Sequence, residues 1–143
     1  MDSKKRLLRW ASGIMLVLGA GHLSLLALFA WGDVAGWADR GLWAAVPLEF
    51  TGGAQTVESL QNKLVFWAGP GGFAVPLFLL GCLIWHLAGR GVAVPAGLGW
   101  GVAAWCALGG VLLVPSPFFA GTVSGALIVV AARDRRPGPS SGG

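Results

Sequence analysis

The sequence predicts an all-α integral membrane protein with four transmembrane helices and an outer amphipathic loop or helix between the first and second of them. Two observations predict this class. Hydrophobic residues make up 55% of the 143 residues and charged residues only 11%, against the ~25% that is typical of soluble domains. Four apolar stretches are separated by segments rich in turn formers and charges. This composition excludes a water-soluble globule, and two cysteines do not make a disulfide scaffold.

The first apolar stretch, Leu7 to Trp31, is long enough to cross the ~30 Å hydrocarbon core as a helix. Lys4, Lys5 and Arg6 precede it, as basic residues precede the apolar part of a signal peptide. The run is longer than the roughly 7 to 15 apolar residues of a signal peptide, and a clear A-x-A cleavage site is missing. We therefore expect an uncleaved helix.

The other three spans are expected at Leu64 to Leu87, Ala96 to Val114 and Phe118 to Ala132. Glycines and prolines between Gly89 and Pro95 separate the second span from the third, and Pro115 to Pro117 separate the third from the fourth. Residues 1–134 are expected to form a single transmembrane domain. The Pro, Gly and Ser-rich residues 135–143 are expected to form a disordered tail.

The segment from Gly32 to Lys63 is too polar to span a membrane, yet its tryptophan and aliphatic residues favour a position on the membrane surface. Within it, Thr56 is expected to cap a helix that runs through Leu60 into the second span. Gly69 to Gly72 and Pro76 then interrupt that span, which predicts a kink facing the bundle, because in lipid a freed backbone group must be satisfied by protein or by a water-filled cavity. The kink either borders a site or merely improves packing.

Basic residues predict the orientation. With the N-terminus in the cytoplasm, eight of the ten Lys and Arg lie inside, and only Arg40 and Lys63 lie outside. The inner set is Lys4, Lys5, Arg6, Arg9, Arg90, Arg133, Arg135 and Arg136. We expect a multi-pass protein of the inner cell membrane with both termini in the cytoplasm. The net charge of +4 thus reflects orientation, and nucleic acid is not an expected partner.

Several turn and packing residues together resemble a known family. They are Phe66-Trp67, Gly81, Arg90, Pro95, Gly99-Trp100, Pro115-Ser116-Pro117-Phe118-Phe119 and the Gly19-x-x-His22 pair. Their pattern resembles a family of small bacterial four-helix membrane proteins that is defined as a domain of unknown function. The resemblance covers most of residues 12–130. It implies the fold and brings no reaction with it.

His22 is the main candidate functional residue, because it falls near the middle of the bilayer, where an ionisable side chain is a functional hypothesis by default. The alternative is a neutral imidazole that is hydrogen-bonded to a neighbouring helix, for example to Ser124. Glu49 and Glu58 border the outer ends of the first two spans. The two acids either join His22 in an outer cavity, where proton transfer to a lipophilic substrate is feasible, or they are solvated loop acids.

A lipophilic ligand in the outer half is expected to meet His22, Trp67, Trp105 and Ser124. Trp105 falls within a helix, where it is either a packing residue that faces the bundle or a platform for a ligand. His86 lies too far from His22 in depth for a shared metal site. No metal or cofactor is therefore expected.

Two cysteines and two glycine pairs have packing roles in this interpretation. Cys82 and Cys106 are expected to be small buried hydrophobes, since they have no C-x-x-C partner. Gly97-x-x-x-Gly101 and Gly121-x-x-x-Gly125 offer smooth helix faces, either for contacts inside the bundle or for a homo-oligomer.

Three functions remain open. The first is binding of a lipid or another lipophilic molecule by a small membrane protein. The second is a membrane-embedded isomerase or cyclase that acts on an isoprenoid or polyketide through Glu49, Glu58 and His22. The third is a small exporter, for which the first span lacks the carboxylate that proton coupling requires.

Overall fold

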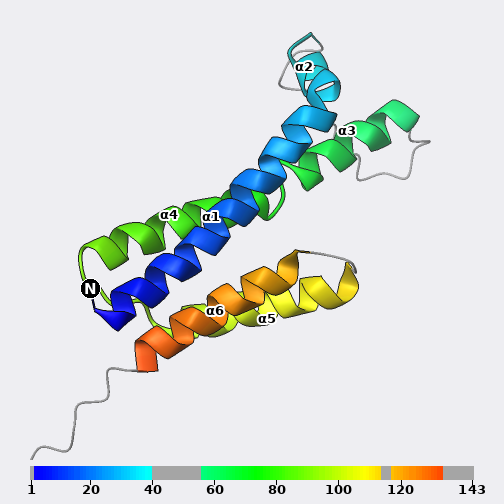
Figure 1. Cartoon of the computed structure of the whole chain (residues 1–143). Helices are drawn as coiled ribbons and strands as arrows, with labels where there is room; N and C mark the ends of the chain where they lie inside the picture. Colours follow the sequence, from blue (N-terminus) through cyan, green and yellow to red (C-terminus); the bar gives the residue numbers. More distant parts are fainter. Residues whose placement is uncertain (1, 40–55, 114–116, 134–143) are drawn as a thin grey trace, which may run out of the picture. The chain divides into compact units, whose positions relative to one another are not determined.

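The computed structural model describes residues 2–39, 56–113 and 117–133, and all the regular structure in these ranges is helical (Figure 1). The helices are α1 (Ser3–Phe29), α2 (Trp31–Asp39), α3 (Val57–Ala68), α4 (Ala74–Gly89), α5 (Ala96–Leu112) and α6 (Phe118–Arg133). The predicted all-α class is confirmed. Glu49, the rest of the outer segment from 40 to 55, and the tail over 135–143 lie outside the described residues.

The helices belong to two compact units, and α1 and α4 each contribute to both. Unit 1 is the described part of Met1–Leu18 and Phe78–Gly143, which holds the first part of α1, most of α4, and all of α5 and α6. Unit 2 is the described part of Gly19–Leu77, which holds the rest of α1, α2, α3 and the start of α4.

In unit 1, α1 and α4 run antiparallel. Near the start of α1, the Arg9 guanidinium carbon lies 5.2 Å from the ring centroid of Trp85, near the end of α4. Further along α1, Leu16 packs on Gly81, where an added Cβ would lie 3.1 Å from the Leu16 side chain. Later residues of α1 therefore contact earlier residues of α4, as in an antiparallel pair of helices. Gly81 is one of the resemblance positions, and here its lack of a side chain leaves room for Leu16.

Small residues let α5 and α6 approach each other closely. A Cβ added to Gly99 would lie 2.8 Å from the carbonyl oxygen of Gly125, and one added to Gly125 would lie 2.5 Å from the backbone nitrogen of Ala103. A Cβ on Gly121 would lie 2.5 Å from Cys106 Sγ. Such close backbones are the contact that small residues permit. The predicted packing role of Gly121 and Gly125 is confirmed.

Gly97 and Gly101 do not contribute to this contact. Both are exposed, and a Cβ added to either would meet nothing within 4 Å. The prediction that they pack inside the bundle is therefore wrong. Gly99 contacts α6 in their place, and a shift of two positions turns a helix face by roughly 200°.

The turn between α4 and α5 is closed by a glycine that adopts a left-handed backbone. Gly91 has φ 69°, and its N–H donates to the carbonyl of Ala88, while the N–H of Val92 donates to that of Leu87. These two bonds form a Schellman motif, which satisfies the last carbonyls of α4 and favours glycine at the left-handed position. Pro95 precedes the first residue of α5 and ends this short connection.

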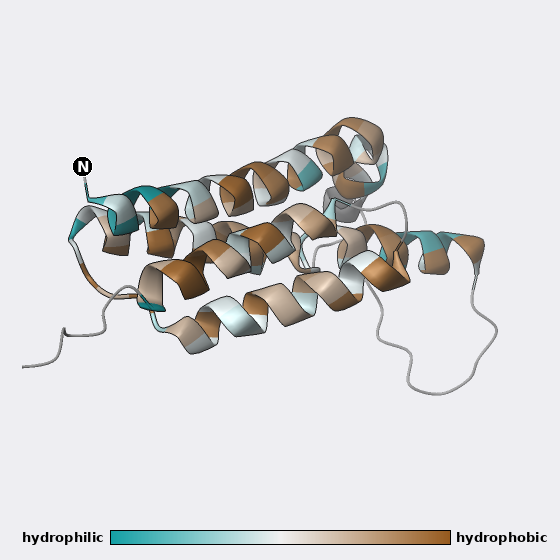
Figure 2. Ribbon diagram, turned by 60° about the horizontal axis from the view of Figure 1, so that its bottom comes forward, coloured by the Kyte–Doolittle hydropathy of each residue, from teal (hydrophilic) through white to brown (hydrophobic). Residues whose placement is uncertain are grey.

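Large apolar side chains cover much of the outside of the helices. Val17 is 73% exposed and Leu112 is 72% exposed, whereas the buried core of unit 1 contains Met15, Ile84 and Ile128. Figure 2 shows hydrophobic residues along the length of the helices. By length and apolar composition, α1 is the one described helix that is able to cross a membrane; α4, α5 and α6 are apolar but have 16, 17 and 16 residues.

Candidate functional site at a helix break

In unit 2, α3 begins at the cap that the sequence predicts. Thr56 has an extended backbone, with φ −74° and ψ 153°, and its hydroxyl oxygen accepts a hydrogen bond from the Ser59 N–H at 3.1 Å. This bond satisfies one of the amides that has no partner at a helix start. Asp33 of α2 accepts from the Gln61 side chain at 3.0 Å, which joins α2 to α3.

The expected kink is a full break between α3 and α4. The Gly71 N–H donates to the carbonyl of Phe66 at 2.9 Å, and the Gly72 N–H donates to that of Gly69 at 3.1 Å. In a continuous helix, the amide of residue 72 would instead donate to the carbonyl of Ala68. The break therefore leaves the Ala68 carbonyl without its normal helical donor.

His22 of α1 supplies the missing donor. Its Nε2 lies 2.7 Å from the carbonyl oxygen of Ala68. A carbonyl oxygen only accepts, so Nε2 carries the hydrogen and donates. The imidazole also lies 5.3 Å from the ring of Phe73, at an interplanar angle of 47°. His22 thus touches the residue before the break and the residue that leads into α4.

Gly72 is closely surrounded by backbone, and Gly69 lies against the end of a side chain. A Cβ on Gly69 would overlap the side chain of Leu26, and one on Gly72 would overlap the carbonyl of Trp67. A larger residue at either position would push the break away from α1 or from the end of α3.

The second ring nitrogen of His22, Nδ1, is an available hydrogen-bond acceptor. When Nε2 carries the hydrogen, Nδ1 has a free lone pair. Among the described residues Nδ1 has no hydrogen-bond partner. It is able to accept a hydrogen bond from a ligand hydroxyl.

Ser124 is not the partner that the sequence suggested for His22. It is buried in α6, within unit 1, and its hydroxyl donates to the carbonyl of Ala11 at 2.7 Å. The carbonyl that His22 contacts belongs to Ala68, a backbone group that side-chain pattern alone does not reveal.

Of the two roles considered for Trp105, packing inside the bundle is wrong, because its side chain is 62% exposed, while the role of a platform for a ligand stays a prediction. The next residue, Cys106, is buried against α6, and adjacent residues of a helix point about 100° apart. Cys106 is buried as expected, whereas Cys82 is exposed and departs from that expectation.

Glu58 and Trp67 both lie on α3 but at different distances from the break. Glu58 is exposed in the first turn of α3, where a carboxylate favours the helix N-terminus. It precedes Ala68 by ten residues, or ~15 Å at helical rise. Trp67 is next to Ala68 but points outward and is 59% exposed. Of the predicted ligand and catalytic residues, the structure thus places Trp67 next to the carbonyl bound by His22 and does not bring Glu58 to it.

Metal ligation finds no support in the described ranges. No group of three or more His, Cys, Asp or Glu residues there is close enough to hold a metal ion. His86 is exposed near the end of α4.

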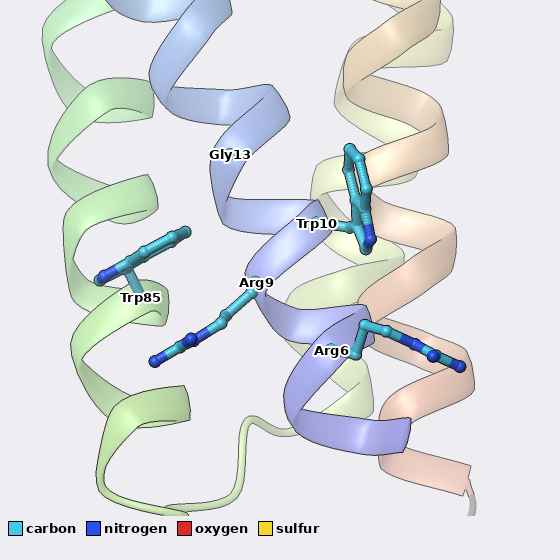
Figure 3. A pocket seen from close by; sticks show the side chains of 5 residues that line it. All are labelled: Arg6, Arg9, Trp10, Gly13 and Trp85. Carbon is cyan, nitrogen blue, oxygen red and sulfur yellow. The ribbon is translucent and has the colours of Figure 1, made fainter. Parts of the chain in front are cut away.

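Unit 1 contains a groove beside two arginines that the sequence reasoning missed (Figure 3). It has a volume of about 280 Å³ and is lined by Arg6, Arg9, Trp10, Gly13 and Trp85. Arg9 points toward Trp85, whereas Arg6 and Trp10 extend to the other side of α1. Arg6, Arg9, Trp10 and Gly13 are three, four and seven positions apart, a spacing that places their Cα atoms on one side of a helix.

A second, apolar groove adjoins the first. It has a volume of about 390 Å³ and is lined by Trp10, Gly13, Ile14, Val17, Leu18 and Ala120. The first five residues belong to α1, and Ala120 belongs to α6. The two grooves share Trp10 and Gly13.

A protein-family model matches residues 6–136, which include nearly every residue described above. The chain belongs to DUF6463, a family of unknown function. Membership confirms the resemblance to a family defined without a function. The DUF6463 match begins at Arg6 and therefore takes in both grooves and the helix break. No curated protein and no solved structure matches this DUF6463 chain.

Proposed function

We propose that this DUF6463 protein is a four-span protein of the inner membrane that binds a lipid or another lipophilic molecule in the groove between α1 and α6. The apolar groove carries the proposal. Its volume of about 390 Å³ falls within the roughly 300–1,000 Å³ of small-molecule sites, and its lining residues are apolar.

Two observations support the membrane part of the proposal. Large apolar side chains such as Val17 and Leu112 are exposed, which is costly in water and favourable in lipid. Two Arg–Trp pairs also support it, because arginine and tryptophan gather at membrane interfaces. Arg9 lies over Trp85, and Arg133 lies 5.7 Å from the ring centroid of Trp100.

The groove changes the proposed position of the ligand. The sequence favours the outer half, near His22, but the groove follows the N-terminal half of α1, which is the inner half if the N-terminus is cytoplasmic. We choose the groove because it combines volume with an apolar lining. Enzymatic use of Glu49, Glu58 and His22, and contact between copies of the chain through Gly97 and Gly101, stay predictions.

A matched pair of glycine variants tests the groove. Gly13 lies in both grooves and Gly21 lies outside them on the same helix, and a Cβ on either would meet nothing within 4 Å. Gly13→Leu should fill the groove without disturbing packing, whereas Gly21→Leu should leave the groove open. Native mass spectrometry of protein extracted in gentle detergent should show a retained lipophilic molecule in the parent and in Gly21→Leu. Gly13→Leu should retain at least about fivefold less of it, as expected for losing the burial of one or two methylene groups.

The opposite outcome is equally clear. If no molecule is retained by the parent, or if Gly13→Leu retains as much as Gly21→Leu, the α1–α6 groove is not a ligand site.

A further inference from the structure

We infer that the ligand is a neutral lipid chain with a carbonyl group at one end. The hydrocarbon lies in the groove between α1 and α6, and the carbonyl oxygen accepts a hydrogen bond from the indole N–H of Trp10. The inference rests on the proposed function and names the class of its ligand. It follows from the apolar lining of this groove and from the position of the one polar atom among its side chains.

The side chains that line the groove between α1 and α6 contain a single polar atom, the Trp10 Nε1. The other five lining residues have hydrocarbon side chains or none: Gly13, Ile14, Val17, Leu18 and Ala120. Neither Arg6 nor Arg9 lines this groove. A charged group or a hydrogen-bond donor inside it would therefore lose its water without gaining a partner, which is unfavourable. The part of the ligand that fills the groove is hydrocarbon.

In a membrane, the one polar atom decides which molecule the groove selects. Lipid tails are as apolar as the lining, so hydrocarbon gains little by moving from the tails into the groove. A hydrogen bond does discriminate, because the surrounding hydrocarbon offers the indole N–H no other partner. An indole N–H only donates, and a carbonyl oxygen is a neutral acceptor without a hydrogen that would itself need a partner.

The Trp10 N–H is available at one end of the groove. The side chain is 65% exposed, and among the described residues its N–H has no hydrogen-bond partner. Figure 3 shows the ring beside α1, with its nitrogen at the end that lies nearer Arg6 in this view. The lining continues along α1 to Leu18, ~12 Å from Trp10 at helical rise. Since an extended chain advances roughly 1.2 Å per bond, a length of ~12 Å accommodates about ten carbons.

The experiment compares two molecules of similar chain length that differ in the carbonyl group. The protein is purified in an alkyl maltoside, which has no carbonyl, and is titrated with methyl decanoate or with decane at equal amounts per micelle. The dissociation constant follows from the rise of the melting temperature with ligand concentration. The parent should bind methyl decanoate at least about fivefold more tightly than decane, the difference expected from one ordinary hydrogen bond.

Trp10→Phe removes the N–H and keeps an aromatic ring, so it should bind methyl decanoate and decane about equally. Trp10 is exposed, and the variant should therefore fold like the parent. Trp100→Phe is the matched control, because Trp100 is also exposed but lines neither groove. It should keep the preference for the ester, and an equal loss of preference in both variants overturns the assignment to Trp10.

Two further ligands test the charge and identify the source of the carbonyl. Ionised decanoate should bind more weakly than methyl decanoate, and tighter binding of decanoate overturns the neutral class. A benzoquinone with a decyl chain places its carbonyl on a ring instead of in an ester. The molecule with the larger preference that depends on Trp10 identifies the source as an ester lipid or a quinone lipid, and either result supports the inference.

Failure of the inference differs from failure of the proposed function. Equal binding of methyl decanoate and decane by the parent, with loss of both in Gly13→Leu, overturns the carbonyl class and leaves the lipophilic groove intact. Absence of any melting shift, or shifts that Gly13→Leu leaves unchanged, overturns the proposed function as well.

Discussion

At the scale of single residues, His22 matters because it satisfies a backbone carbonyl that a helix break has freed. His22→Leu removes the donor to Ala68 and leaves that oxygen unpaired, so we expect a loss of about 1–3 kcal/mol of stability. His22→Gln is the control, since its amide nitrogen donates from a similar position. Thermal melting in detergent should show a clear decrease for the leucine variant and a smaller one for glutamine. Equal melting of the leucine variant and the parent would mean that another group satisfies Ala68.

Ser124 offers a second test at this scale. Its buried hydroxyl joins α6 to the Ala11 carbonyl of α1, whereas the Ser12 hydroxyl donates to the Arg9 carbonyl within α1. Ser124→Ala should cost about 1 kcal/mol, since it removes a bond between two helices. Ser12→Ala should lower the stability by less, because the bond that it removes lies within one helix and joins no second helix to it. Equal melting of the two variants would show that the α1–α6 bond contributes no more than the local one.

At the scale of helices, the contact between α5 and α6 makes alanine act in opposite ways at two glycines. Gly125→Ala forces a Cβ against the Ala103 backbone, and overpacking of this kind costs about 1–3 kcal/mol. Gly101→Ala has open space and should gain up to about 1 kcal/mol from helix propensity. Melting temperatures in detergent should therefore move down for the first variant and up for the second. If both melting temperatures moved in the same direction, Gly125 would not lie at the α5–α6 contact as described.

Helix ends were easier to predict from the sequence than helix faces. Thr56, the break after Ala68 and the start of α5 after Pro95 are signalled by residues whose effect is local, since a capping hydroxyl or a missing N–H acts within one turn. Trp105 and Gly97 were placed on the wrong side because α5 is apolar all round. When the outside of a helix is as hydrophobic as the inside, composition gives no information on its rotation.

The candidate site was predictable only in part for a related reason. His22 was found because a lone ionisable residue in an apolar run is conspicuous. Its acceptor was not found, because every residue has a backbone carbonyl. The carbonyl of Ala68 becomes free to accept from His22 only because the amide of Gly72 donates to Gly69 instead. The groove beside Arg6 and Arg9 was missed because Trp85 joins Arg9 from a distant part of the sequence.

At the scale of the whole molecule, the proposed four-span topology makes a direct prediction. Once Cys82 and Cys106 have been replaced by alanine, cysteines introduced at Glu58 and Arg90 should lie on opposite sides of the membrane. An impermeant maleimide added to intact cells should modify Glu58→Cys, and it should reach Arg90→Cys only after the membrane is opened. Modification of both from the same side would overturn the arrangement and the depth of every residue discussed above.

Helix lengths have a consequence for the lipid around such a protein. The 27 residues of α1 extend for ~40 Å, whereas α4, α5 and α6, with 16 to 17 residues each, extend for only ~24 to 26 Å. In the proposed four-span topology, with a hydrocarbon core of ~30 Å, the long helix would tilt and the bilayer would thin beside the short ones. The mismatch between helix length and bilayer thickness is thus positive at α1 and negative at α5 and α6. Lipids with short or disordered chains would suit this arrangement best, and the bilayer would be thinnest along α5 and α6.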